Sequence, residues 1–123
     1  MTMAQVPATR YQSSSCDIDY TPGSAVTGGD VIVLGSVVGI ATQDIAANAK
    51  GSLALEGVFK VPKITGANAV GTLIYWDPAG DPVNGTAGSG AATSTAGSLK
   101  QLGYVAEASL SADETVKVVL SKA

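Results

Sequence analysis

Short apolar runs separated by turn residues fill the chain from residue 29 onward. The clearest runs are DVIVL at 30–34, VVGIA at 37–41, TLIYW at 72–76, QLGYVAEA at 101–108 and TVKVVLS at 115–121. Each run has the length of a strand and is rich in β-branched or aromatic residues. Turn residues lie between them, such as Gly35-Ser36 and the DPAGDP stretch at 77–82. This spacing predicts an all-β domain.

A longer stretch at residues 53–61 alternates between two kinds of position. Leu53, Leu55, Phe59 and Val61 share one face, and Ala54, Glu56, Val58 and Lys60 take the other. An alternation with a period of two is typical of a half-buried strand, so we predict a single strand here that ends at Pro62. Small residues at 92–96 predict one weak strand, and residues 43–49 are the only helical candidate.

Together these runs predict about seven or eight short strands that form a small β-barrel or sandwich. Residues 1–28 differ from the rest, because they are polar, carry serines at 13–15 and show no regular period. Alone, such a segment buries too little apolar surface to offset the entropy lost on ordering. We therefore predict an extended N-terminal arm at 1–28 and a β-barrel or sandwich domain at 29–123.

Several classes of function are disfavoured by what the chain lacks. It has no histidine, which removes the commonest general base and zinc ligand. No lysine follows a glycine in a phosphate-binding loop, and Cys16 is the only cysteine. The net charge is -3, and the six lysines and Arg10 are scattered, so no basic patch for nucleic acid is present. We expect no enzyme, catalytic residue, metal, cofactor, small-molecule substrate, nucleic-acid partner or membrane partner.

Four residues are candidates for an interface. Tyr75-Trp76 is the largest aromatic pair, and alternation along a strand predicts that one ring faces the core while its neighbour faces outward. An outward aromatic ring is a common anchor of protein interfaces. Glu56 and Lys60 share one face of the predicted strand and are expected to form a surface or inter-subunit ion pair.

An ordered set of segments resembles a family of small tailed-phage head proteins, the capsid decoration or cement proteins. This family was formerly a domain of unknown function and is sometimes labelled recombinase-like. The segments that carry the resemblance are GDVIV at 29–33, VGIA at 38–41, LALEGVF at 53–59, YWD at 75–77 and LGYVAEA at 102–108. The likeness extends over roughly residues 18–121. The recombinase-like label has no support here, because the chain lacks a nucleotide-binding loop.

The resemblance implies a structural virion protein that binds the exterior of a phage capsid and stabilises the expanded shell. It also implies the major capsid protein as partner, a homotrimer, and a place on the capsid exterior after synthesis in the host cytoplasm. The polar arm suits a strand added to an exposed sheet edge of the capsid protein. The predicted arm contacts are Gln5, Val6, Pro7, Arg10, Tyr11 and Tyr20.

Two other functions stay open at this point. A surface-exposed β module could recognise a host-cell glycan or protein, with Tyr75, Trp76 and Asp77 as its candidate cluster. A hydrolase could use Asp77 and Asp81 as an acid and base pair if both carboxylates were buried and close. Because the two aspartates bracket a Pro/Gly turn, the interpretation as turn-forming carboxylates is favoured.

Overall fold

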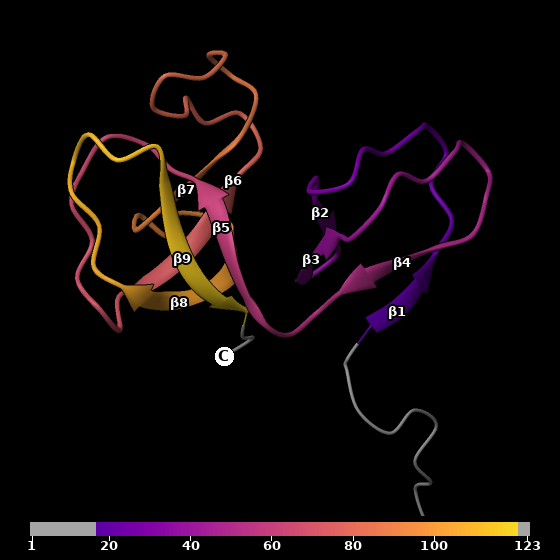
Figure 1. Cartoon of the computed structure of the whole chain (residues 1–123), viewed down its shortest axis with the longest axis horizontal. Coiled ribbons are helices and arrows are strands. Elements are labelled where there is room, and N and C mark those ends of the chain that lie inside the picture. Colours follow the sequence, from indigo (N-terminus) through magenta and orange to yellow (C-terminus); the bar gives the residue numbers. More distant parts are fainter. Residues whose placement is uncertain (1–16, 121–123) are drawn as a thin grey trace, which may run out of the picture.

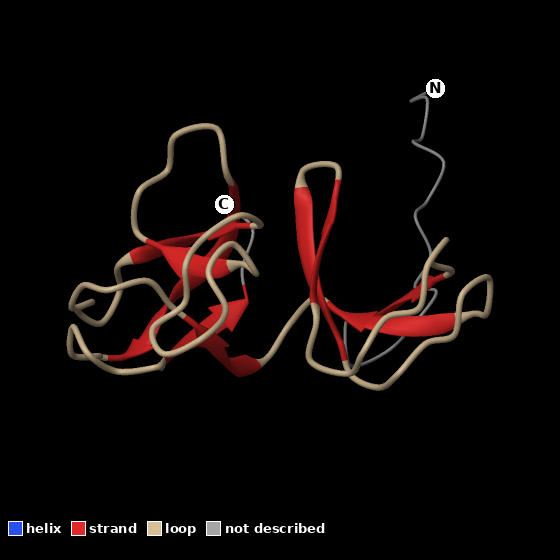
Figure 2. Ribbon diagram, turned by 90° about the horizontal axis from the view of Figure 1, so that it is seen from above, coloured by secondary structure: helices blue, strands red, loops and turns tan. Residues whose placement is uncertain are grey.

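The computed structural model describes residues 17–120 and contains nine β-strands in two antiparallel sheets (Figure 1). The strands are β1 (Asp17–Tyr20), β2 (Val31–Leu34), β3 (Val37–Ala41), β4 (Gly51–Ala54), β5 (Val58–Pro62), β6 (Leu73–Asp77), β7 (Ala91–Thr93), β8 (Lys100–Glu107) and β9 (Thr115–Leu120). The all-β prediction is confirmed: the described residues contain no helix (Figure 2), and hence none that could cross a membrane.

The first sheet has the strand order β1-β4-β3-β2. Its β2–β3 hairpin pairs Leu34 with Val37 across Gly35-Ser36, which confirms the turn predicted there. The second sheet has the order β5-β9-β8-β6-β7. A parallel bridge between Lys63 and Ala92 brings its two edge strands together at one end. Neither sheet closes into a barrel, so the arrangement agrees with the sandwich alternative.

Two apolar cores hold these sheets. The larger core is made mostly by inward side chains of the second sheet, but it also receives Val38 and Ile40 from β3 of the first sheet. The smaller core contains Val26, Ala41, Ile45 and Leu53. Ala41 follows Ile40 directly and points to the other side of the strand. Strand β3 therefore contributes to both cores and joins the two sheets.

The prediction of one strand at 53–61 is wrong. Residues up to Ala54 belong to β4 of the first sheet, and residues from Val58 belong to β5 of the second sheet. Between them Gly57 has φ +117°, a conformation that side chains rarely adopt, and the extended backbone breaks there. Leu53 and Ala54 of β4 are both buried, although alternation placed them on opposite faces. The strand does end at Pro62, as predicted.

The helical candidate at 43–49 is also wrong. Ile45 instead exchanges two backbone hydrogen bonds with Val26, each of 2.8 Å, and buries its side chain in the smaller core. The weak strand predicted at 92–96 is found as β7, from Ala91 to Thr93. Of the segment 1–28, residues 1–16 lie outside the described part of the chain, and β1 occupies 17–20. An arm with a boundary at residue 28 stays a prediction.

Candidate functional site: the outer face of the second sheet

Three exposed apolar side chains and one half-buried one, Val119, form a continuous row across four strands of the second sheet. Leu73 of β6 pairs with Tyr104 of β8, Tyr104 with Val119 of β9, and Val119 with Val58 of β5. Because directly paired residues lie on the same side of a sheet, the four side chains share one face. Val58 is 59% exposed, Leu73 45% and Tyr104 40%. We call these four residues the apolar row.

The row faces solvent because the residues beside it in sequence fill the larger core. Ile74, Val118 and Val105 are fully buried in that core, one position along from Leu73, Val119 and Tyr104. At the level of the row, each outward apolar side chain is therefore flanked in sequence by an inward apolar one. A solvated sheet face normally carries polar side chains at the outward positions. An apolar row at those positions is a candidate interaction surface.

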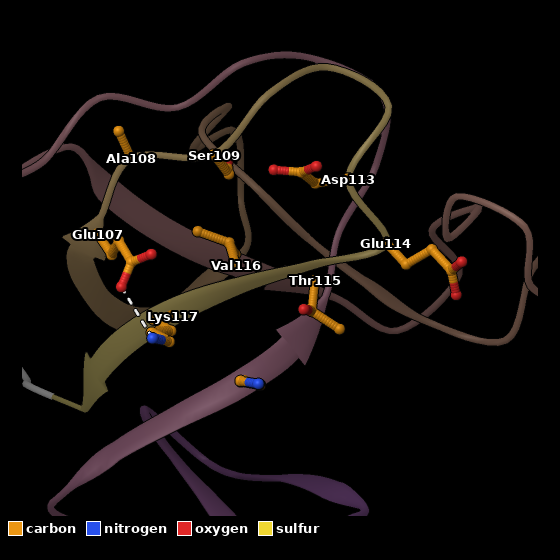
Figure 3. Close-up of a pocket in the computed structure, with 9 residues that line it drawn as sticks. Glu107, Ala108, Ser109, Asp113, Glu114, Thr115, Val116 and Lys117 are labelled. Carbon is orange, nitrogen blue, oxygen red and sulfur yellow. Dashed lines mark hydrogen bonds and ion pairs between the residues drawn. The ribbon is translucent and has the colours of Figure 1, made fainter.

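One step along the strands, the same outer face becomes charged (Figure 3). Lys60 of β5 pairs directly with Lys117 of β9, and Lys117 Nζ lies 2.8 Å from Glu107 Oε2 of β8. The hydrogen bond from Lys117 and its positive charge lower the pKa of Glu107 below its ordinary value of 4.5. A groove of about 310 Å³ runs past these residues to Asp113 and Glu114. Among the described residues, Lys60 makes no ion pair.

The loop at 108–114, which borders this groove, is held by a buried lysine. Lys63 is fully buried, and its Nζ donates hydrogen bonds to four backbone carbonyls at 3.0–3.4 Å: those of Ile64, Leu110, Ser111 and Asp113. Three of these four carbonyls belong to the loop. A buried ammonium requires several acceptors, because it has left water. The carbonyls supply them, and Lys63 thereby fixes the path of the loop.

Two further contacts fix the same loop. Asn68 and Ser109 exchange backbone hydrogen bonds of 3.0 and 2.9 Å, and the Asn68 amide also donates to the Ser109 hydroxyl. The Leu110 N–H donates to Asp113 Oδ2 at 2.8 Å. Despite this fixed backbone, the Leu110 side chain is 71% exposed, more than any other large apolar side chain described. The loop therefore presents an apolar tip from a rigid base.

Sequence reasoning missed this loop and its lysine. Nothing in the local pattern around Lys63 distinguishes it from a surface lysine, since its carbonyl partners on the loop lie 47–50 positions later in the chain. The one signal is its place between Pro62 and Ile64, directly after a predicted strand.

The predicted interface residues separate in the structure. Lys60 lies on the outer face, and Tyr75, two residues beyond Leu73 on β6, is half-buried on the same side. Trp76 belongs to the larger core and is 7% exposed. Glu56 lies in the connector between the two sheets, and no ion pair with Lys60 forms among the described residues.

The predicted arm contacts are mostly outside the described residues. Gln5, Val6, Pro7, Arg10 and Tyr11 all precede residue 17, where the description begins. Tyr20 is the exception: it ends β1 and packs against the smaller core. The arm contacts therefore stay predictions.

The candidate carboxylates for catalysis have structural roles. Asp77 Oδ1 accepts a hydrogen bond from the Ala79 N–H at 3.0 Å, and Asp81 Oδ1 accepts one from the Gly88 N–H at 2.7 Å. Asp77 thus stabilises the turn that follows it, as the turn interpretation predicted, and Asp81 closes the loop that runs to Gly88. Trp76 is 7% exposed, so the proposed glycan cluster presents little indole surface. Among residues 17–120, no group of three or more candidate ligands is placed to hold a metal ion.

Comparison with known proteins identifies the family. The family model for phage cement proteins matches residues 11–120, which include every strand described above. No curated protein and no solved structure matches the chain. The match covers most of the sequence and supports a structural, capsid-binding role, and the resemblance found in the sequence is confirmed. This chain belongs to the phage cement protein family.

Proposed function

We propose that this protein binds the exterior of a phage capsid and stabilises the expanded shell. The observation that carries the proposal is the family match over residues 11–120. A protein that binds the assembled shell and not its separated subunits shifts the equilibrium towards the shell by mass action. Many copies on one lattice add their effects, so a modest affinity per copy is sufficient. No catalytic chemistry is required for this role.

The partner in this proposal is the major capsid protein, and the arm makes the contact. Strand β1 lies at one edge of the first sheet, where β4 is its partner. The first residue of β1, Asp17, therefore lies at the margin of a sheet. An extended segment there can add a strand to an exposed sheet edge of the capsid protein, using backbone hydrogen bonds for affinity. The protein acts as a homotrimer on the capsid exterior, after synthesis in the host cytoplasm.

A truncation tests this proposal. Removing residues 1–15 deletes the predicted contacts Gln5 to Tyr11 and spares β1, which pairs with β4 and is needed for the first sheet. Full-length and truncated protein are each mixed with expanded empty shells, and bound copies are counted after sedimentation. Shell disassembly on heating is followed by light scattering.

The expected result is saturable binding and a higher disassembly temperature for the full-length protein, and loss of both for the truncated protein. The urea midpoints of the two proteins should agree, which shows that the domain remains folded. Equal occupancy by the truncated protein would remove the arm from the contact. Failure of the full-length protein to bind the shells would refute the capsid role itself.

A further inference from the structure

We propose that the unpaired edge of β2, together with the groove beside it, receives an extended segment of the major capsid protein that carries a basic side chain. The capsid segment continues the first sheet beyond β2 through backbone hydrogen bonds. This inference rests on the proposed function and adds a second contact to it. The arm adds a strand to the capsid protein, whereas here the capsid protein adds a strand to this chain.

Strand β2 pairs with β3 on one side, and its other edge has no strand neighbour within residues 17–120. The Ala41 N–H donates to the Asp30 carbonyl at 2.9 Å, and regular pairing with β3 continues from Val31 to Leu34. Hydrogen-bonded residue pairs alternate with non-bonded ones along an antiparallel pair of strands. The N–H and C=O groups of Val31 and Val33 therefore point away from β3, where an added strand can bond them.

The other described sheet edges are protected, and β2 is not. Strand β1 carries two aspartates, β5 carries Lys60 and Pro62, and the short β7 is bridged to Lys63. Strand β2 has only apolar side chains, and Val33 is 37% exposed. Charges, prolines and covering segments are the usual devices that keep other chains away from a sheet edge. Their absence from β2 indicates an edge that accepts a strand.

A groove of about 380 Å³ lies beside the first half of β2. Residues 29–32 form one wall, and Pro62, Trp76, Pro78 and residues 89–90 form the other. Figure 1 shows the β2–β3 hairpin on the side of the first sheet that faces the second sheet. Trp76 packs so closely on Gly90 that a Cβ there would lie 2.7 Å from an indole carbon. This wall is therefore preformed, and its prolines suit an apolar side chain of the incoming strand.

The charge of the groove defines the chemistry of the partner. Asp30 is the only charged residue among those that line it, and it makes no ion pair within the described part of the chain. Its Oδ2 accepts the Thr27 N–H at 3.0 Å, and the next amide, that of Gly28, donates to Asp44 Oδ1 at 2.8 Å. Two exposed carboxylates thus lie at the same end of β2. They favour a strand that brings a lysine or an arginine.

The major capsid protein is the occupant that these observations favour. The family match supports a capsid-binding role. Extended segments bind sheet edges through backbone hydrogen bonds for affinity and through side-chain pockets for specificity. A second copy fits less well, because residues 17–120 contain ten carboxylates against five lysines and would bring charge of the same sign to Asp30.

Hydrogen exchange on the unmodified protein tests the contact first. The protein is bound to expanded empty shells, exchange is quenched after set times, and each amide is compared with that of the free protein. The amides of Val31 and Val33 should exchange at least about tenfold more slowly in the bound state, because each gains a hydrogen bond. The Ile32 amide faces β3 and should be slow in both states.

A proline on β2 tests the edge by substitution. Val33→Pro is compatible with the fold, because the Val33 N–H is not used for pairing with β3, but it blocks an added strand. Val58→Pro is the matched control: the Leu120 N–H donates to the Gly57 carbonyl at 2.9 Å, so the Val58 N–H also points away from its partner strand. Bound copies are counted after sedimentation with shells, and urea midpoints report folding. Val33→Pro should raise the dissociation constant about tenfold, while Val58→Pro should match the wild type.

A neutral variant tests the charge and does not depend on the proline. Asp30→Asn keeps an oxygen that can accept the Thr27 N–H and removes the charge. Asp113→Asn is the control, because Asp113 also accepts a backbone N–H, that of Leu110, and the net charge changes equally. Asp30→Asn should weaken shell binding about three- to tenfold and reduce its salt dependence, while Asp113→Asn should leave both unchanged.

The outcomes separate this inference from the proposed function. A wild type that binds shells without protection of Val31 and Val33, or a Val33→Pro variant that binds equally well, would overturn the inference and leave the capsid role intact. A wild type that does not bind shells would refute both. Protection in the free protein that is lost on removal of residues 1–15 would assign the edge to the arm. Self-association that Val33→Pro abolishes would assign it to a second copy, and either result would overturn the inference.

Discussion

The two sheets have four and five strands, yet they are stabilised very differently. The larger core, inside the second sheet, is lined by eleven buried side chains, and the smaller core beneath the first sheet has four. Two of the eleven, Val38 and Ile40, come from β3 of the first sheet. The first sheet thus depends on the second for part of its burial, while the second fills its own interior. We infer that the second sheet sets global stability and that the first can open locally.

The sharpest test of this difference removes one large aliphatic side chain from each core. Ile74 of the larger core and Leu53 of the smaller core are both fully buried. Ile74→Ala should lower the free energy of unfolding by about 3–4 kcal/mol, through lost burial and the cavity left behind. Leu53→Ala should cost about 2 kcal/mol, because the smaller core has only four buried side chains and Leu53 therefore loses fewer buried contacts. Urea denaturation measures both values.

Hydrogen exchange then shows where each variant opens. Leu53→Ala should accelerate exchange in β1 and β4 while β8 and β9 remain protected. Uniform acceleration in both sheets would mean that the two sheets unfold as one unit. The inference that the first sheet opens locally would then be wrong.

The second largest loss of stability is expected on substitution of Lys63, the buried residue that follows β5 of the second sheet. Lys63→Met keeps the length of the side chain but removes the ammonium donor from four backbone carbonyls. The carbonyls of Leu110 and Ser111 each keep one backbone donor, whereas among the described residues Lys63 is the one donor to those of Ile64 and Asp113. Loss of these hydrogen bonds should lower stability by about 2–3 kcal/mol. Urea denaturation measures the loss, and exchange should accelerate first in the loop 108–114. Lys60→Met is the matched control, since Lys60 is exposed and should change stability by less than about 0.5 kcal/mol.

These differences explain which features the sequence could predict. Strands β2, β3, β6, β8 and β9 were expected within one or two residues of their observed bounds, because local alternation and turn residues determine them. The split at Gly57 was missed because the pattern at 53–61 is compatible with one long strand. Only pairing with β9, some 60 positions later, assigns Val58 to a different sheet from Ala54.

The candidate site was predicted less well than the fold. The sequence predicted that one ring of Tyr75-Trp76 faces outward but could not say which. The four residues of the apolar row are ordinary strand residues until the register is known. Lys63 shows the same limit in the interior. Its burial depends on carbonyls from a distant loop. Because every residue has a backbone carbonyl, the sequence does not show which carbonyls accept such a hydrogen bond.

A third prediction returns to the first sheet and its tight smaller core. A Cβ on Gly51 would lie 2.5 Å from side-chain carbons of Ile45, so Gly51→Ala forces that side chain to shift. The expected cost is about 1–2 kcal/mol of stability from overpacking. Gly23→Ala is the control, because a Cβ there meets nothing within 4 Å. If urea denaturation gave a loss below about 0.5 kcal/mol for Gly51→Ala, the smaller core would accommodate the added methyl group without strain, and the prediction of overpacking would be wrong.

The smallest expected effect concerns the charged part of the outer face, and it depends on pH. The pKa of Glu107 is lowered in the folded protein by Lys117, so the ionised carboxylate is favoured there. The resulting stabilisation is fully present above the ordinary pKa of 4.5 and is lost as the pH falls through the lowered folded value. Glu107→Gln should therefore narrow the stability difference between pH 7 and acid pH, with the two proteins converging in the acid range. Because the pair is exposed, added salt should reduce the effect. If, at low salt, the change in urea midpoint between pH 7 and acid pH were the same for Glu107→Gln as for the wild type, the Glu107–Lys117 ion pair would not contribute to stability.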